Sequence, residues 1–168
     1  MTSDPALILT EQVNDAPSRK ARTTLLRRLI DVVAMPSSRI PPQDRSMAGD
    51  ILLEMLFDAE EEDRAFCARR LIPTHEAPRR VLRYLGLCSI ETAAPLLEQN
   101  PSFDDSDINF ILRRSTPMHA EAVARRKTLS PSVCDTLVQL GHVPAIREML
   151  ASRRSFISET AMDDLMEI

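Results

Sequence analysis

The sequence of 168 residues is poor in aromatic residues and glycine, with one tyrosine, no tryptophan and three glycines. Gly49, Gly86 and Gly141 stand far apart, which excludes a glycine-rich phosphate loop. No run approaches the ~18 uncharged apolar residues of a membrane-spanning helix, so we expect no membrane insertion. We also expect no secretory leader, because Asp4 and Pro5 precede the first short apolar run, and we therefore expect a cytoplasmic protein.

Cysteine is also scarce: Cys67, Cys88 and Cys134 are odd in number, widely spaced and set among apolar residues. This pattern predicts buried reduced thiols rather than disulfides. No spacing of cysteine and histidine fits a zinc site. The acidic run from Asp58 to Asp63 is typical of a helix start, where carboxylates favour the positive end of the helix dipole. We expect this run and the run from Asp104 to Asp107 to be solvated. We expect neither a metal nor a cofactor.

What the sequence does contain is apolar residues at helical spacing. Hydrophobic residues make up 43% and charged residues 27% of the chain, as in a helical soluble protein. Residues 1–17 show no clear period and stop at Pro17, so we expect an N-terminal segment that is only partly ordered. From Ser18 to about Met35 the pattern predicts an amphipathic helix. Residues 18–168 are then expected to form a single α-helical repeat domain. The apolar stripe of the first helix is Ala21, Leu25, Leu29 and Val32 or Val33, and a second helix from about Asp44 is expected to bury Met47, Ile51, Leu52, Met55 and Leu56.

The second half of the chain repeats itself. Each copy is a short helix, a tight loop that ends on one large apolar residue, and a second helix, with offsets of 26 or 27 residues. Prolines at the expected first positions of several helices support this interpretation, since that amide would be unpaired anyway. Self-similarity at this period predicts an all-α, HEAT-like α-solenoid of about four helical pairs with an N-terminal helical extension. The matching residues are Leu97, Val123 and Leu150, followed six positions later by Phe103, Leu129 and Phe156.

A more distant copy of the unit precedes these, because Ala68-Arg69-Arg70 matches Ala124-Arg125-Arg126 letter for letter. Together with the arginine-rich run from Asn14 to Val33 and the segment Ala93-Ala94-Pro95-Leu96-Leu97-Glu98, this pattern resembles the bacterial domain of unknown function 2336 family over about residues 14–168. The resemblance implies HEAT-type helical repeats. It implies no activity, because the family has no established activity or catalytic residues to carry over.

Arginine accounts for 19 of the 21 basic residues, and three arginine pairs fall near the ends of the first helices of successive copies. Stacked copies would bring them into one basic strip whose planar side chains suit carboxylate or phosphate. The alternative is that these cations only neutralise helix C-termini, where the dipole favours them. The strip consists of Arg69, Arg70, Arg125, Arg126, Arg153 and Arg154.

No nucleophile with a neighbouring base and no catalytic motif is recognisable, so we do not expect an enzyme. We expect a protein-interaction or scaffold module that binds another protein through the helical-repeat surface. A first alternative is a sensor of an anionic small ligand or signalling nucleotide that uses the arginine ladder. A second is a HEAT-like DNA-binding or DNA-repair protein, although a net charge of −4 and the scarcity of aromatic residues argue against nucleic acid.

Overall fold

The computed structural model describes residues 5–152 and 159–166, and within these ranges it is helical with no β-strand. The all-α prediction is confirmed. The helices are α1 (Pro5–Val33), α2 (Pro42–Phe57), α3 (Glu61–Leu71), α4 (Arg79–Leu85), α5 (Ile90–Gln99), α6 (Asp105–Leu112), α7 (Pro117–Ala124), α8 (Pro131–Leu140), α9 (Val143–Ala151) and α10 (Glu159–Met166). None of the described helices combines the length and the apolarity needed to cross a membrane.

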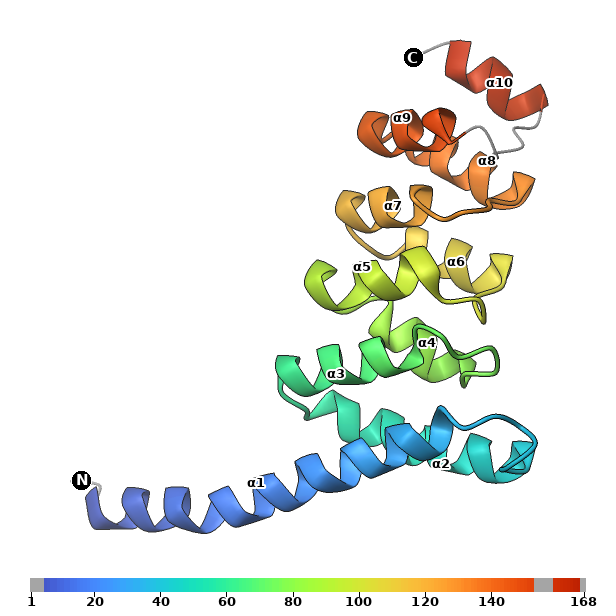
Figure 1. The fold of residues 1–168 in the computed structure, drawn as a ribbon. Helices are drawn as coiled ribbons and strands as arrows, with labels where there is room; N and C mark the ends of the chain where they lie inside the picture. Colours follow the sequence, from blue (N-terminus) through green and yellow to red (C-terminus); the bar gives the residue numbers. More distant parts are fainter. Residues whose placement is uncertain (1–4, 153–158, 167–168) are drawn as a thin grey trace.

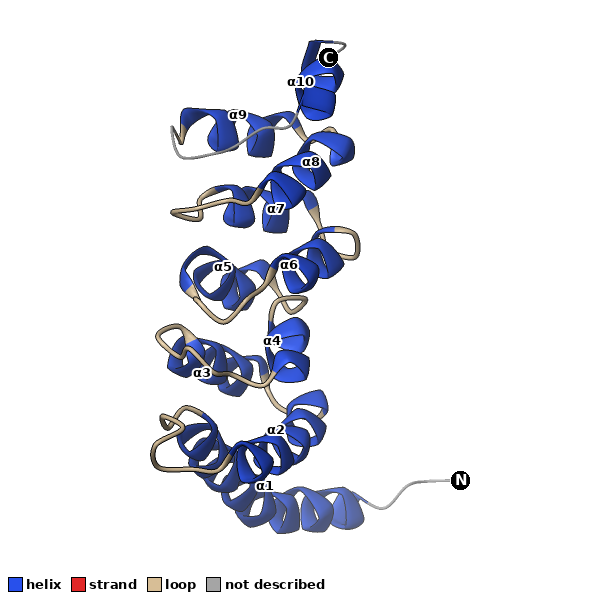
Figure 2. Ribbon diagram, turned by 90° about the vertical axis from the view of Figure 1, so that its right-hand side faces the viewer, coloured by secondary structure: helices blue, strands red, loops and turns tan. Residues whose placement is uncertain are grey.

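The helices stack in layers of two (Figure 1). Helices α3, α5, α7 and α9 pack on one another in one column, and α2, α4, α6 and α8 form the second column. Helices α1 and α2 pack side by side and make the first layer, while α10 packs against α8 at the other end. The loops that join the two helices of a layer lie along one side of the stack (Figure 2). We call this side, formed by residues 34–41, 72–78, 100–104 and 125–130, the loop edge.

A fixed spacing of 26 residues places the core of the first column. Leu71, Leu97, Val123 and Met149 follow one another at this spacing, and each is completely buried. The prediction that Leu150 is the third residue of the row with Leu97 and Val123 is wrong, because the side chain of Leu150 is 49% exposed. The local helical pattern tolerates a shift of one residue, whereas the packing between layers selects Met149.

The residue that closes each loop is buried as the repeat predicts. Phe103 and Leu129 are 7% and 4% exposed, and Ala77 holds the same place one layer earlier with 7% exposure. Phe156 lies outside the described residues. Local capping also follows the sequence: Asp104 and Asp107 form a reciprocal capping box at α6, and Ser130 caps α8 by accepting a hydrogen bond from the amide of Val133.

The first layer differs most from expectation. Helix α1 begins at Pro5, so the helix start predicted at Ser18 is wrong, and Pro17 lies inside the helix. A proline removes one amide donor, yet α1 continues through it. The division of the chain at residue 17 stays a prediction. The expectation that Leu25, Met47 and Ile51 are buried is also wrong, because they are 51%, 66% and 49% exposed.

Candidate interaction surface at the loop edge

The loop edge contains an open groove of about 720 Å³ between the first two layers. Its walls come from the end of α1, the loop after it, the end of α3 and the loop that follows α3. Both apolar and charged side chains line it, and Met35 and Pro73 are among the apolar ones. We call this cavity the loop-edge groove. Its charged and titratable members are Asp31, Arg70, His75 and Glu76.

Ion pairs hold the two walls of this groove together. Arg70 on α3 reaches Asp31 on α1 with a closest nitrogen–oxygen distance of 2.6 Å. Glu76 accepts hydrogen bonds from Ser37 at 3.0 Å and from the nearly buried Arg45 at 2.7 Å. These donors, Ser37 first and Arg45 second, lower the pKa of the Glu76 carboxyl below its ordinary value. The groove is therefore shaped by contacts within the chain before any partner arrives.

Farther along the loop edge, Arg126 closes the end of the preceding layer. Its guanidinium donates to the carbonyl oxygen of Leu97 and, at 2.9 Å, to that of Asn100. The same cation lies 6.0 Å from the ring centre of Phe103. Burial lowers the pKa of the Arg126 guanidinium. Its donors therefore serve the end of α5, whose last carbonyls have no partner inside their own helix.

Asn100 makes the same contacts one layer earlier. Its side-chain amide donates to the carbonyl of Leu71 at 2.5 Å and to that of Thr74 at 3.2 Å. Leu71 and Leu97 are themselves equivalent at the 26-residue spacing, so Asn100 and Arg126 are equivalent too. The sequence aligns Arg70 with Arg126 letter for letter. In the structure, Arg70 lies one helical turn before the position that is equivalent to Asn100 and Arg126, so Arg70 and Arg126 are not equivalent.

The six arginines of the predicted strip thus have different surroundings. Arg69 is exposed in the last turn of α3. Arg70 is paired with Asp31, Arg125 donates to Glu98 at 2.8 Å, and Arg126 is bound to backbone carbonyls. Arg153 and Arg154 lie outside the described residues. In the described part, three arginines of the strip tie neighbouring layers together.

The second column carries a polar cluster that the sequence did not reveal. Asp107 is completely buried and accepts hydrogen bonds from Arg83 at 2.6 Å and from Arg79 at 3.1 Å. Arg79 also reaches Asp104 at 2.8 Å. The expectation that the run from Asp104 to Asp107 is solvated is wrong for Asp107. One feature of the sequence could have indicated these ion pairs. Arg79 and Arg83 are four residues apart and therefore lie on one face of α4, one layer before the acidic run.

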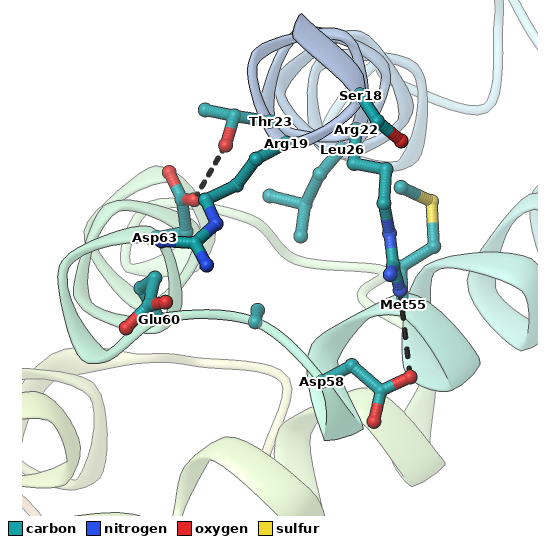
Figure 3. Close-up of a pocket in the computed structure, with 10 residues that line it drawn as sticks. Ser18, Arg19, Arg22, Thr23, Leu26, Met55, Asp58, Glu60 and Asp63 are labelled. Carbon is teal, nitrogen blue, oxygen red and sulfur yellow. Dashed lines mark hydrogen bonds and ion pairs between the residues drawn. The ribbon is translucent and has the colours of Figure 1, made fainter. Parts of the chain in front are cut away.

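A smaller cavity of about 220 Å³ lies between α1 and the start of α3 (Figure 3). Thr23 donates to Asp63 at 3.0 Å, and Arg22 reaches Asp58 at 3.4 Å. Asp63 is 7% exposed, so the predicted solvated run is partly buried against α1. Within the described residues, no group of three histidine, cysteine or acidic side chains is arranged to hold a metal ion.

Comparison with known proteins gives one match. Residues 92–167 match the family model described as an uncharacterised protein conserved in bacteria (DUF2336). This span runs from α5 to the end of α10, and the resemblance is confirmed there. No curated protein and no solved structure matches the chain. The loop-edge groove, built from residues 31–76, lies outside the matched span.

Proposed function

Because residues 92–167 match the model of an uncharacterised bacterial family, DUF2336, which carries no known activity, we propose a function from the surface itself: the chain is a non-enzymatic interaction module that holds a partner protein. We further propose that the stack is a HEAT-like α-solenoid of about four helical pairs that presents the loop edge to this partner. A cytoplasmic location is part of the same proposal, and the reduced thiols of Cys67 and Cys88 fit it.

The observation that carries the proposal is the loop-edge groove. It is open, about 720 Å³ in volume and lined by both apolar and charged side chains. Such a surface suits an extended polypeptide, whose apolar side chains would cover Met35 and Pro73 and whose polar groups would meet His75 and Glu76. Because the ion pair of Arg70 with Asp31 already holds the walls, a partner would meet a pre-formed site at a lower cost in conformational entropy.

The charges of the loop edge favour a protein over a free anion. Arg70 and Arg125 face carboxylates 2.6 and 2.8 Å away, and Arg126 donates to backbone carbonyls. A phosphate would have to compete with these partners for each guanidinium. An anionic-ligand sensor would therefore have to break contacts between layers before it could bind.

Two carboxyls, Glu61 and Glu76, do not have the property that a general acid requires. Hydrogen bonds lower the pKa of Glu61 and of Glu76, chiefly those from Ser89 and Ser37. A general acid at neutral pH needs the opposite, a carboxyl whose pKa is raised by desolvation or by a neighbouring negative charge.

Affinity capture with groove variants tests the proposal. We expect the tagged chain to capture a protein from bacterial lysate, and the purified partner to bind the chain directly in a titration. Met35→Glu and His75→Glu change exposed groove residues and should weaken this binding. Met118→Glu is the matched control, because Met118 is 56% exposed on α7 and away from the groove. A partner that binds the groove variants as tightly as the control variant would contradict the proposal.

A thermal-shift screen against nucleotides distinguishes a sensor of an anionic ligand from a scaffold that binds only protein. A ligand present at 100 times its dissociation constant stabilises the folded state by about 2.7 kcal/mol. A nucleotide that raises the melting temperature of the original chain but not that of Arg70→Gln and Arg125→Gln would favour the sensor and overturn the scaffold proposal.

A further inference from the structure

The outer face of the first layer carries the apolar residues that the sequence predicts to be buried. Leu25 on α1 and Met47 and Ile51 on α2 are about half exposed or more, and the outward surface of this layer has no helix over it among the described residues (Figures 1 and 2). Helices α1 and α2 use their opposite faces to pack on α3 and α4. We call the outward surface of α1 and α2 the end face.

The apolar residues of the end face form one continuous surface across the two helices. On α1, Leu25 and the half-buried Val32 are seven residues apart and therefore share a face. On α2, Met47 and Ile51 are four residues apart and therefore also share a face. Both rows point away from the buried sides of their helices. In each later layer of the stack, the corresponding surface is covered by the preceding layer.

The charges at the two rims of this face have opposite signs. Arg28 is exposed beside Leu25 and Val32 on α1, and Glu54 is exposed beside Ile51 on α2. No ion pair within the described part of the chain involves either residue, while Arg22 and Asp58, farther along the same two helices, do reach each other. Because α2 turns back along α1 after the loop at residues 34–41, this contact places Arg28, six residues after Arg22, and Glu54, four residues before Asp58, at similar heights along the helix pair.

We propose that the end face is a self-association surface and that its occupant is a second copy of this chain. The two-fold axis lies in the interface between the two copies and runs parallel to α1 and α2. It places α1 of one copy over α2 of the other. The apolar rows then cover each other, and Arg28 of each copy meets Glu54 of the other, so each charge pair forms twice. A surface that complements itself under two-fold rotation is what a symmetric dimer requires.

This dimer leaves the loop-edge groove open, because the groove lies between the first two layers at the loop edge, whereas the end face is the outward surface of the first layer. The self-association surface is therefore independent of the proposed partner binding. A dimer would carry two grooves, so a partner with two binding segments would gain from avidity.

Sedimentation velocity of the full chain over a range of concentrations tests the proposal. We expect a reversible monomer–dimer equilibrium. Ile51→Glu and Leu25→Glu introduce charges at positions that are exposed in the monomer, so they should leave the fold intact and raise the dimer dissociation constant about tenfold or more. Met118→Glu, with the same change at an exposed residue on α7, should dimerise like the original chain.

A charge reversal tests the geometry. Arg28→Glu and Glu54→Arg should each weaken the dimer, because like charges would then face each other in both copies of the pair. The double variant should restore the association, since the pair forms again with its signs exchanged. A chain that stays monomeric at all attainable concentrations, or a dimer that is insensitive to Ile51→Glu, would overturn the proposal. Circular dichroism of each variant separates these outcomes from misfolding.

Discussion

Arg126 and Asn100 occupy equivalent positions in adjoining layers and perform the same task with different side chains. Each donates hydrogen bonds to carbonyls at the end of the helix one layer earlier, Arg126 to Leu97 and Asn100 to Leu71. Helix ends leave carbonyls without partners, and here the next layer supplies the donors. The stack is therefore held by polar contacts at the loop edge as well as by its apolar core.

Replacement of Arg126 by methionine should destabilise the fold. The change keeps an unbranched apolar side chain over Phe103 and removes the donors to Leu97 and Asn100. The carbonyls of these two buried residues are then left unpaired, at a cost of about 1–3 kcal/mol in the free energy of unfolding. Arg125→Met is the matched control, because its ion pair with Glu98 is exposed to solvent and is worth about 0–1 kcal/mol. Urea denaturation of both variants gives the two values. Equal losses would show that Arg126 contributes no more than a surface charge.

The sequence predicted the architecture better than it predicted the polar contacts. The helices and the row of Leu97 and Val123 follow from apolar spacing, which is local information that can be read along the chain. The contacts of Asp107 with Arg79 and Arg83 join residues 24 and 28 positions apart, and no local pattern specifies them. For this reason the sequence alone indicates a solvated run from Asp104 to Asp107.

The arginine strip shows the same limit. Identical letters at Arg70 and Arg126 suggested equivalent positions, yet the equivalent of Arg126 in the structural register is Asn100. Donors of different chemistry can close a helix end, so the function of the position persists while the residue type changes. Exposure of Leu25 and Ile51 could not be read from the sequence either, because an uncovered end face has the same apolar pattern as a covered one.

The register of the last layer can be tested with two neighbouring residues. Met149→Ala removes a completely buried side chain and should cost about 2–5 kcal/mol in unfolding free energy. Leu150→Ala, at a position that is 49% exposed, should change it by less than about 0.5 kcal/mol. Thermal and urea unfolding of the two variants make the comparison. A larger loss for Leu150→Ala would restore the 27-residue offset and contradict the register.

Asp107 should be the most sensitive carboxylate of the second column. Asp107→Asn keeps the volume and removes the charge that binds Arg83 and Arg79, so we expect a loss of about 1.5–3 kcal/mol in unfolding free energy. Asp105→Asn is the control, since Asp105 is exposed in the same first turn of α6 and contributes about 0.3–1 kcal/mol through the helix dipole. If both variants lose the same amount, the buried contacts of Asp107 add nothing to the dipole effect.

Glu61 should make stability depend on pH in the acid range. Ser89 is the N-cap residue of α5, but its side chain makes no capping hydrogen bond. Its hydroxyl donates instead to the Glu61 carboxylate on α3, as does the hydroxyl of Thr92 at 2.7 Å. These two hydrogen bonds, that from Ser89 first, lower the pKa of Glu61 from its ordinary value of 4.5. The unfolded chain therefore binds a proton at a higher pH than the folded chain does.

The stability that the Glu61 carboxylate contributes is complete at neutral pH and is lost as the pH falls below 4.5 and through the lowered pKa. Glu61→Gln lacks this ionisation, so the difference in unfolding free energy between the original chain and the variant should be constant near pH 7 and shrink in acid. Glu62→Gln removes a charge from the same turn without touching Ser89 or Thr92, and it corrects for the change in net charge. Urea denaturation at a series of pH values measures the differences. If the Glu61→Gln difference does not vary with pH after this correction, the carboxylate does not link α3 to α5.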